Sequence, residues 1–131
     1  MIISFKIISL FVFLSFLQQE PLKTIDATSF NKEISNRTDI KTPDELIRLY
    51  HIENENSEGT RKFSIETEVI EENYYKITLI HEGVPDDSVS AVKIIMKAKR
   101  NGCKWTVTEI KKTWKCWKER GHADWGIEPC R

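Results

Sequence analysis

The sequence predicts an α+β domain in which an N-terminal helix packs on a four-stranded antiparallel sheet. Two patterns predict this class: a capped amphipathic segment begins at Thr42, and from Lys62 onward apolar residues recur at every second position. The second pattern is typical of strands with one buried face. The chain has 131 residues, 40% hydrophobic and 31% charged. This composition suits one globular domain and excludes collagen, a disordered polyampholyte and a polytopic membrane protein.

Residues 1–19 are expected to form a signal peptide. A positive charge at Lys6 precedes Ile7–Leu17, an apolar stretch interrupted only by serines, and this order of regions is typical of an export signal. The stretch is too short to cross a hydrocarbon core of about 30 Å, which needs about 20 apolar residues. We expect cleavage near Gln19, no stable membrane span afterwards, and a secreted or periplasmic product. A buried N-terminal helix and an uncleaved anchor are the alternatives.

A polar segment, residues 20–41, separates the signal peptide from a single domain that spans residues 42–131. Phe30 and Ile34 predict a short helix in this segment, with Ser29 as its cap. Asn36-Arg37-Thr38 matches the acceptor pattern for N-glycosylation.

The helix of the domain is expected to start at Thr42-Pro43-Asp44-Glu45. Threonine can cap a helix, proline suits the first helical position, and a glutamate at the third completes a capping box. Leu46, Leu49 and Tyr50 then share one face at helical spacing.

Four strands are expected to follow, each with one apolar face. Their inward residues are Phe63, Ile65, Thr67 and Val69; Tyr75, Ile77, Leu79 and His81; Val92, Ile94, Met96 and Ala98; and, within residues 104–117, Trp105 and Val107. The positions of Ile110 and Trp114 indicate a bulge or a change of face in the fourth strand. Asn101-Gly102 predicts a type I′ hairpin turn, which needs positive φ at both central residues. We expect the main core to comprise Leu49, Phe63, Ile65, Ile77, Leu79, Val92, Ile94, Met96, Trp105 and Val107.

Charge is unevenly distributed along a chain whose 20 basic and 20 acidic residues cancel. Acidic residues predominate between Glu53 and Asp87, and basic residues between Lys93 and Arg120. Pairing of opposite charges across neighbouring strands is the favoured interpretation, and a polyanionic partner is the alternative. The zero net charge gives no reason to expect a nucleic-acid partner.

The order of a helix followed by four antiparallel strands, over Thr42 to Trp117, resembles the cystatin-like and NTF2-like class. That resemblance implies a curved sheet that wraps around the helix, and either a binding module or a pocket enzyme. The C-terminal pattern WKCW…RGH…DW…C is similar to a tail found on small exported bacterial proteins.

The three cysteines predict one disulfide and one free thiol. Cys103 and Cys116 bracket a strand, and at about 3.3 Å per residue they lie about 40 Å apart, whereas a disulfide needs Cα atoms within about 7 Å. Cys130 therefore pairs with one of them. We favour Cys116–Cys130, which leaves Cys103 free, over Cys103–Cys130.

The tail between Cys116 and Cys130 is expected to be an aromatic cap held by this disulfide. Its candidate ligand-binding residues are Trp117, Arg120, His122, Asp124 and Trp125, because tryptophan faces stack on rings and hold cations. Recognition of an anion or a sugar by these residues is the alternative to a purely structural cap. A zinc site of cysteines with His122 and Asp124 lacks the usual ligand spacing. A catalytic His122–Asp124 pair, or a Cys103–His122 pair, is a further alternative.

The function expected from these features is a binding or structural interaction module outside the cytoplasm. Its partner would be a small molecule, a glycan or a protein, and no cofactor or metal is expected. The second interpretation is an NTF2-like pocket enzyme with an acid–base residue among Tyr74, Tyr75, His81, His122 and Asp124. The third, a cystatin-like protease inhibitor, lacks the expected glycine and Q-x-V-x-G loop. A deep apolar pocket with a buried carboxylate or histidine of perturbed pKa would favour the enzyme, and a shallow, filled cone would favour the binding module.

Overall fold

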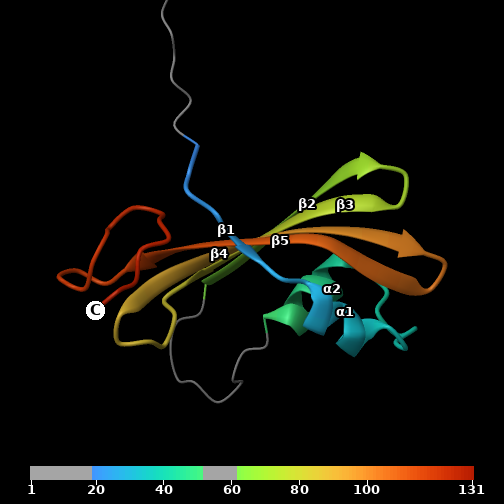
Figure 1. Ribbon diagram of the computed structural model, residues 1–131, viewed down its shortest axis with the longest axis horizontal. Coiled ribbons are helices and arrows are strands. Elements are labelled where there is room, and N and C mark those ends of the chain that lie inside the picture. Colours follow the sequence, from blue (N-terminus) through green and yellow to red (C-terminus); the bar gives the residue numbers. More distant parts are fainter. Residues whose placement is uncertain (1–18, 52–61) are drawn as a thin grey trace, which may run out of the picture.

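The computed structural model describes residues 19–51 and 62–131, so nearly all of the expected signal peptide lies outside the described residues. These residues form an antiparallel sheet of five strands and two helices, which confirms the α+β class. The helices lie on one face of a strongly twisted sheet (Figure 1). In chain order the elements are β1 Lys23–Ile25, α1 Thr28–Ile34, α2 Pro43–Tyr50, β2 Lys62–Glu71, β3 Tyr74–Glu82, β4 Val89–Asn101 and β5 Lys104–Cys116.

The sheet has five strands instead of the four predicted, in the order β1-β5-β4-β3-β2. The additional strand, β1, comes from the polar segment and places Lys23 opposite Lys112 and Ile25 opposite Ile110. Of its residues, Ile25 packs against the core. A strand of three residues with one packed apolar side chain shows no alternating pattern, which is why the sequence did not reveal it.

Helix α1 buries Phe30 and Ile34, as their spacing predicted. The predicted cap is wrong, because Ser29 lies inside the first turn and the cap position carries no side-chain hydrogen bond. Instead, Oδ1 of Asp26 accepts a hydrogen bond from the Thr28 N–H at 2.8 Å. A short aspartate side chain can satisfy a backbone donor two residues ahead in this way.

Helix α2 begins as predicted, with one difference in its capping box. Oγ1 of Thr42 accepts a hydrogen bond from the Glu45 N–H at 3.2 Å. The Glu45 carboxylate accepts from the N–H of Lys41 at 2.8 Å, one residue before the partner that a capping box predicts.

The buried face of α2 differs from the predicted one. Leu46 and Ile47 are completely buried, whereas Leu49 and Tyr50 are only partly buried. The ring of Tyr50 packs edge-on against Phe30 of α1 at 5.1 Å between centroids, and Ile47 lies in the core. Among the described residues, no helix is long and apolar enough to span a bilayer.

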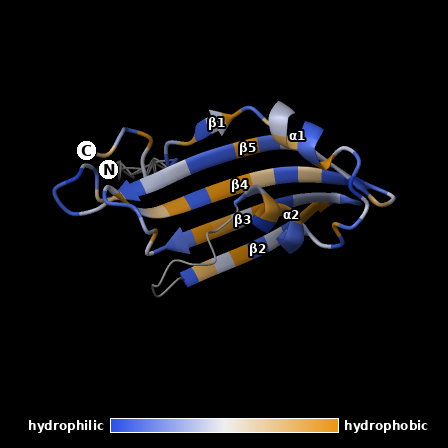
Figure 2. Ribbon diagram, turned by 90° about the horizontal axis from the view of Figure 1, so that it is seen from below, coloured by the Kyte–Doolittle hydropathy of each residue, from blue (hydrophilic) through white to orange (hydrophobic). Residues whose placement is uncertain are grey.

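Strand pairing aligns the side chains of the inner face in rows that cross the sheet. One row consists of Ile65, Leu79, Ile94, Lys112 and Lys23, and the next consists of Phe63, His81, Val92 and Trp114. Figure 2 shows α1 and α2 over one half of the sheet, while the half that leads to the end of β5 has no helix above it. The second row lies in this uncovered half, next to the end of α2.

The predicted irregularity in the last strand is a bulge. Lys97 pairs with Glu109 and Ala98 pairs with Val107, so Thr108 is an extra residue in β5. Because of the bulge, the side chain of Ile110 points into the core, and it is fully buried.

The hairpin between β4 and β5 turns one residue later than predicted. Asn101 pairs with Lys104, so the central residues are Gly102 and Cys103. Gly102 has a φ of 61°, while Cys103 is not among the residues with positive φ. A glycine with positive φ at the first central position is typical of a type II′ turn, and the expected type I′ turn is wrong.

Seven of the ten predicted core residues are buried, and the other three, Leu49, Phe63 and Ile65, are partly buried and pack against the core. Phe63 and Ile65 are less buried because β2 is the outermost strand, and Val69 farther along it is 66% exposed. Residues of the buried core outside the ten expected for it are Phe30, Ile34, Ile40, Leu46, Ile47, Ala98 and Ile110.

Opposite charges pair across the outer face of the sheet at a few positions. Glu68 of β2 lies opposite Lys76 of β3. Glu109 of β5 lies 3.2 Å from the ammonium groups of both Lys97 and Lys111. Each of these contacts lies within one segment, and no ion pair among the described residues joins the acidic segment to the basic one, so the interpretation of the uneven charge stays a prediction. Exposed pairs of this kind add only about 0–1 kcal/mol each.

Candidate functional site

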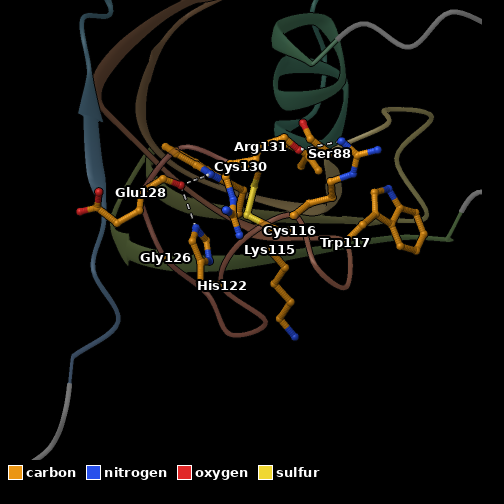
Figure 3. Close-up of a disulfide and its surroundings, with 12 residues drawn as sticks. Ser88, Lys115, Cys116, Trp117, His122, Gly126, Glu128, Cys130 and Arg131 are labelled. Carbon is orange, nitrogen blue, oxygen red and sulfur yellow. Dashed lines mark hydrogen bonds between the residues drawn. A yellow bond between two sulfur atoms is a disulfide. The ribbon is translucent and has the colours of Figure 1, made fainter.

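The C-terminal tail is tied to β5 by a disulfide and by backbone pairing. Cys116 and Cys130 are disulfide-bonded, as predicted, with Cα atoms 5.5 Å apart (Figure 3), and Cys103 is free and exposed. The Trp114 N–H donates to the Gly126 carbonyl at 3.0 Å, and the Gly126 N–H donates to the Trp114 carbonyl at 2.9 Å. The tail therefore continues the edge of the sheet beyond β1.

His122 holds the two arms of this tail together. Its Nδ1 lies 2.8 Å from the Asp124 carbonyl oxygen and its Nε2 lies 2.8 Å from the Glu128 carbonyl oxygen. Carbonyl oxygens only accept hydrogen bonds, so an imidazolium ring donates both bonds, whereas a neutral ring can donate one. A Cβ at position 126 would lie 3.0 Å from the ring, so Gly126 leaves the space in which the ring lies. This arrangement gives His122 a structural role.

The cysteines and His122 also lie close enough for a metal site. Sγ of Cys116, Sγ of Cys130 and a ring nitrogen of His122 lie within 4.8 Å of one another. Zinc binds cysteine as the thiolate, and in this structure the two sulfur atoms are bonded to each other. The zinc alternative therefore requires prior reduction of the disulfide.

The side chains of Trp117 and Arg120 make their hydrogen bonds away from the His122 ring. The indole Nε1 of Trp117 donates to the carbonyl of Asp86 at 2.7 Å, in the loop between β3 and β4, and the ring points away from His122 (Figure 3). The Arg120 side chain is exposed, and its guanidinium lies 3.4 Å from the carbonyl of Arg131.

Trp125 and Asp124 lie together in a different place. Both line a hollow of about 340 Å³ with Lys115 and residues 19–21. The ammonium groups of Lys93 and Lys115 lie 4.5 and 4.7 Å from the centre of the Trp125 ring, which is the distance of a cation–π contact. The five residues proposed from the sequence as one ligand site thus lie in four different surroundings, and of these five only Asp124 and Trp125 share a hollow.

A second hollow lies on the inner face of the sheet, in the half that the helices leave uncovered. Its volume is about 390 Å³, within the range of about 300–1,000 Å³ that is usual for small-molecule sites. Strands β1, β4 and β5, the loop after β3 and the residue after α2 supply its wall. The apolar part of the wall consists of Ile25, Val84, Val89, Val92 and Trp114.

The charged part of this wall is mostly basic. Lys23 and Lys112 line the hollow, and Asp86 is its one carboxylate among the described residues. Oδ1 of Asp86 accepts hydrogen bonds from the N–H groups of Val89 and Ser88, at 2.9 and 2.8 Å, and from the Ser88 hydroxyl. These bonds lower the pKa of the Asp86 carboxyl below its ordinary value of 3.8, so the group is a carboxylate at neutral pH.

A pair of histidines lies beside the hollow. His51, directly after α2, is part of the wall, and its Nε2 lies 3.1 Å from Nδ1 of His81. His81 is 2% exposed and its ring stacks on Phe63 at 4.4 Å between centroids. Because a buried neighbour fixes its ring, His51 is held in one orientation at the edge of the hollow.

The other acid–base candidates lie elsewhere. Tyr74 and Tyr75 begin β3, at the opposite end of that strand from His81. The Tyr74 hydroxyl lies 3.1 Å from the Thr108 hydroxyl, and the Tyr75 ring packs near Trp105. Of the residues considered for acid–base chemistry, only His81 is associated with the hollow.

None of the residues that line this hollow was predicted as a ligand-binding residue from the sequence. Four of them are Lys23, His51, Lys112 and Trp114. The spacing contained a signal for two of them, because Lys112 and Trp114 follow Ile110 at every second position and therefore face inward. His51 and Lys23 gave no such signal, since chain folding alone brings them to the sheet.

Comparison with known proteins adds no assignment. No protein-family model matches the chain, and neither a curated protein nor a solved structure is significantly similar to it.

Proposed function

We propose that the protein is an extracytoplasmic binding module whose small-molecule ligand occupies the hollow on the inner face of the sheet. The observation that carries this proposal is the apolar-walled hollow of about 390 Å³. Ligand sites are concave and mostly apolar, with a few polar groups that orient the ligand. Of the partners expected from the sequence, a small molecule fits this surface better than a glycan or a protein.

The location and the fold family belong to the same proposal. The Cys116–Cys130 disulfide is compatible with an oxidising compartment, as is the signal peptide expected from residues 1–19. Two helices that cover one half of one face of a twisted sheet support placement in the cystatin-like or NTF2-like class.

Binding of N-phenylnaphthylamine, a neutral fluorescent apolar probe, tests the proposal. Val89→Phe would fill the hollow and is expected to weaken probe binding about tenfold, which corresponds to about 1.4 kcal/mol. Val69→Phe, on the exposed end of β2, is the matched control and should bind as the unchanged protein does. Val84→Phe, in the loop, repeats the test if Val89→Phe does not fold. Equal binding by all these variants would overturn the proposal.

An acid–base enzyme is the second candidate, and the His51–His81 pair favours it. A histidine at the wall of a hollow, oriented by a buried partner at 3.1 Å, has the arrangement of a general acid–base group. Recovery of each bound compound after long incubation separates the two candidates by mass spectrometry. A binding module returns the compound unchanged. Conversion that His51→Gln abolishes, with binding intact, would replace the binding proposal by the enzyme.

A further inference from the structure

Two lysines lie directly opposite each other inside the hollow. Lys23 of β1 and Lys112 of β5 are register partners on neighbouring strands, and both contribute to the wall. They occupy the same row as the buried Ile94. Lys112 is half-buried and Lys23 is exposed. Like charges placed directly opposite on paired strands destabilise a sheet, so this pair opposes folding in the absence of a counter-charge.

The described part of the chain supplies no ion pair to either lysine. Ion pairs that it does contain link Arg37 with Asp39, Lys93 with Glu20, and Glu109 with Lys97 and Lys111. Within the part of the wall that the structure describes, Asp86 is the one carboxylate, and its Oδ1 already accepts three hydrogen bonds from residues of its own loop. Among the described residues of the wall, the two lysines therefore exceed the one carboxylate by one positive charge when His51 is neutral.

The apolar part of the wall adjoins these lysines. Trp114 follows Lys112 at the next inward position of β5 and lies opposite Val92 of β4, and both residues line the hollow. A ligand that satisfies the whole wall has an apolar body against Trp114 and Val92 and a single negative charge near Lys23 and Lys112.

We propose that the hollow binds an amphiphilic organic monoanion, with its carboxylate or sulfate group between Lys23 and Lys112. This inference rests on the proposed function and adds the ligand class. One negative charge neutralises the excess of the wall and removes the repulsion between the two ammonium groups, so ligand and fold stabilise each other.

Calorimetry with decanoate, decyl sulfate and decanol, below their micelle-forming concentrations, tests the charge requirement. The unchanged protein should bind both anions about tenfold or more tightly than the neutral alcohol. Lys23→Met/Lys112→Met should lose this preference and keep its affinity for decanol. Lys111→Met, on the same strand with its side chain on the outer face, is the matched control and should keep the preference. Lys112→Gln repeats the test if the double variant does not fold.

A second readout excludes a merely structural role for the lysines. Without ligand, the double methionine variant should unfold at the same temperature as the unchanged protein or at a higher one, because the like-charge contact is gone. A lower unfolding temperature, equal affinity for anions and decanol, or the same loss in Lys111→Met would overturn the inference.

Val89→Phe separates the two proposals. If it weakens decanol binding while the lysines have no effect, the hollow is the ligand site and only the anion assignment fails. If Val89→Phe changes nothing, the proposed function itself fails.

Discussion

The side-chain amide of Asn31 makes both hydrogen bonds that a neighbouring strand would make to Val107. Nδ2 of Asn31 donates to the Val107 carbonyl and its Oδ1 accepts from the Val107 N–H, each at 2.8 Å. Helix α1 thereby satisfies the edge of β5 at a point that β1 does not reach. An amide has a donor and an acceptor at the spacing of a backbone unit, which a carboxylate or an alcohol lacks.

Asn31→Ala is therefore expected to destabilise the protein. It removes both partners of a partly buried backbone pair, and each unsatisfied group costs about 1–3 kcal/mol. Urea unfolding should show a fall in the free energy of unfolding toward the lower end of that range, since water can reach the pair. Asn36→Ala, on an exposed residue between the helices, is the control. Equal stability of both variants would show that the Asn31 contact contributes nothing.

Loss of the disulfide should destabilise the protein more. Cys116→Ser/Cys130→Ser opens a loop with a sequence separation of 14 residues, and losing a native bridge from a small domain usually costs about 2–5 kcal/mol. Cys103→Ser changes an exposed thiol in a turn and should leave stability unchanged. Peptide mapping of unreduced protein gives the direct check. A peptide that links Cys103 to Cys130 would contradict the assignment.

His122→Ala should loosen the tail while Asp124→Ala should not. The ring of His122 bonds the backbone carbonyl of Asp124, so the Asp124 carboxylate takes no part in that contact. Hydrogen exchange at the Gly126 N–H, which bonds Trp114, reports on the tail locally. Faster exchange is expected for the His122 variant alone. Equal acceleration in both variants would mean that the carboxylate, and not the ring, orders this segment.

Acid should loosen the loop between β3 and β4. Hydrogen bonds, first among them that from the Val89 N–H, lower the pKa of the Asp86 carboxyl in the folded protein. A carboxyl with a lowered pKa adds stability above its unfolded value, near 3.9, and this contribution disappears as pH falls through the folded value. Amide exchange at Ser88 and Val89, after correction for the intrinsic rate, should therefore speed up below about pH 4. Asp86→Asn should abolish this pH dependence.

The sequence predicted the parts of the fold in which apolar residues recur at one regular spacing. The alternation of Ile77, Leu79 and His81 fixes which face of β3 is buried, and the length of β5 rules out a Cys103–Cys116 bridge. These inferences need no knowledge of neighbouring elements, because the pleat of a strand and the reach of a chain are local properties.

The features that the sequence did not predict depend on tertiary contacts between distant segments. Strand β1 forms because β5 offers it an edge, and Ile47 is buried because the core accepts a side chain outside the face that the helical spacing predicted. Asn101-Gly102 satisfies the rule for one turn type, yet strand pairing moves the turn to Gly102-Cys103. The candidate hollow was the least predictable feature, since Lys23, His51 and Lys112 come from three distant segments.

The exposed end of β2 has a consequence for how the protein behaves in concentrated solution. This outermost strand of ten residues ends with Val69 and Ile70, which are 66% and 41% exposed, and no described segment pairs with its outer edge. Such an edge can recruit the same strand from another molecule. Here Glu66, Glu68 and Glu71 lie along the same stretch of β2, so two copies aligned edge to edge bring carboxylates together. The mutual repulsion of these charges opposes growth of the sheet from one molecule to the next.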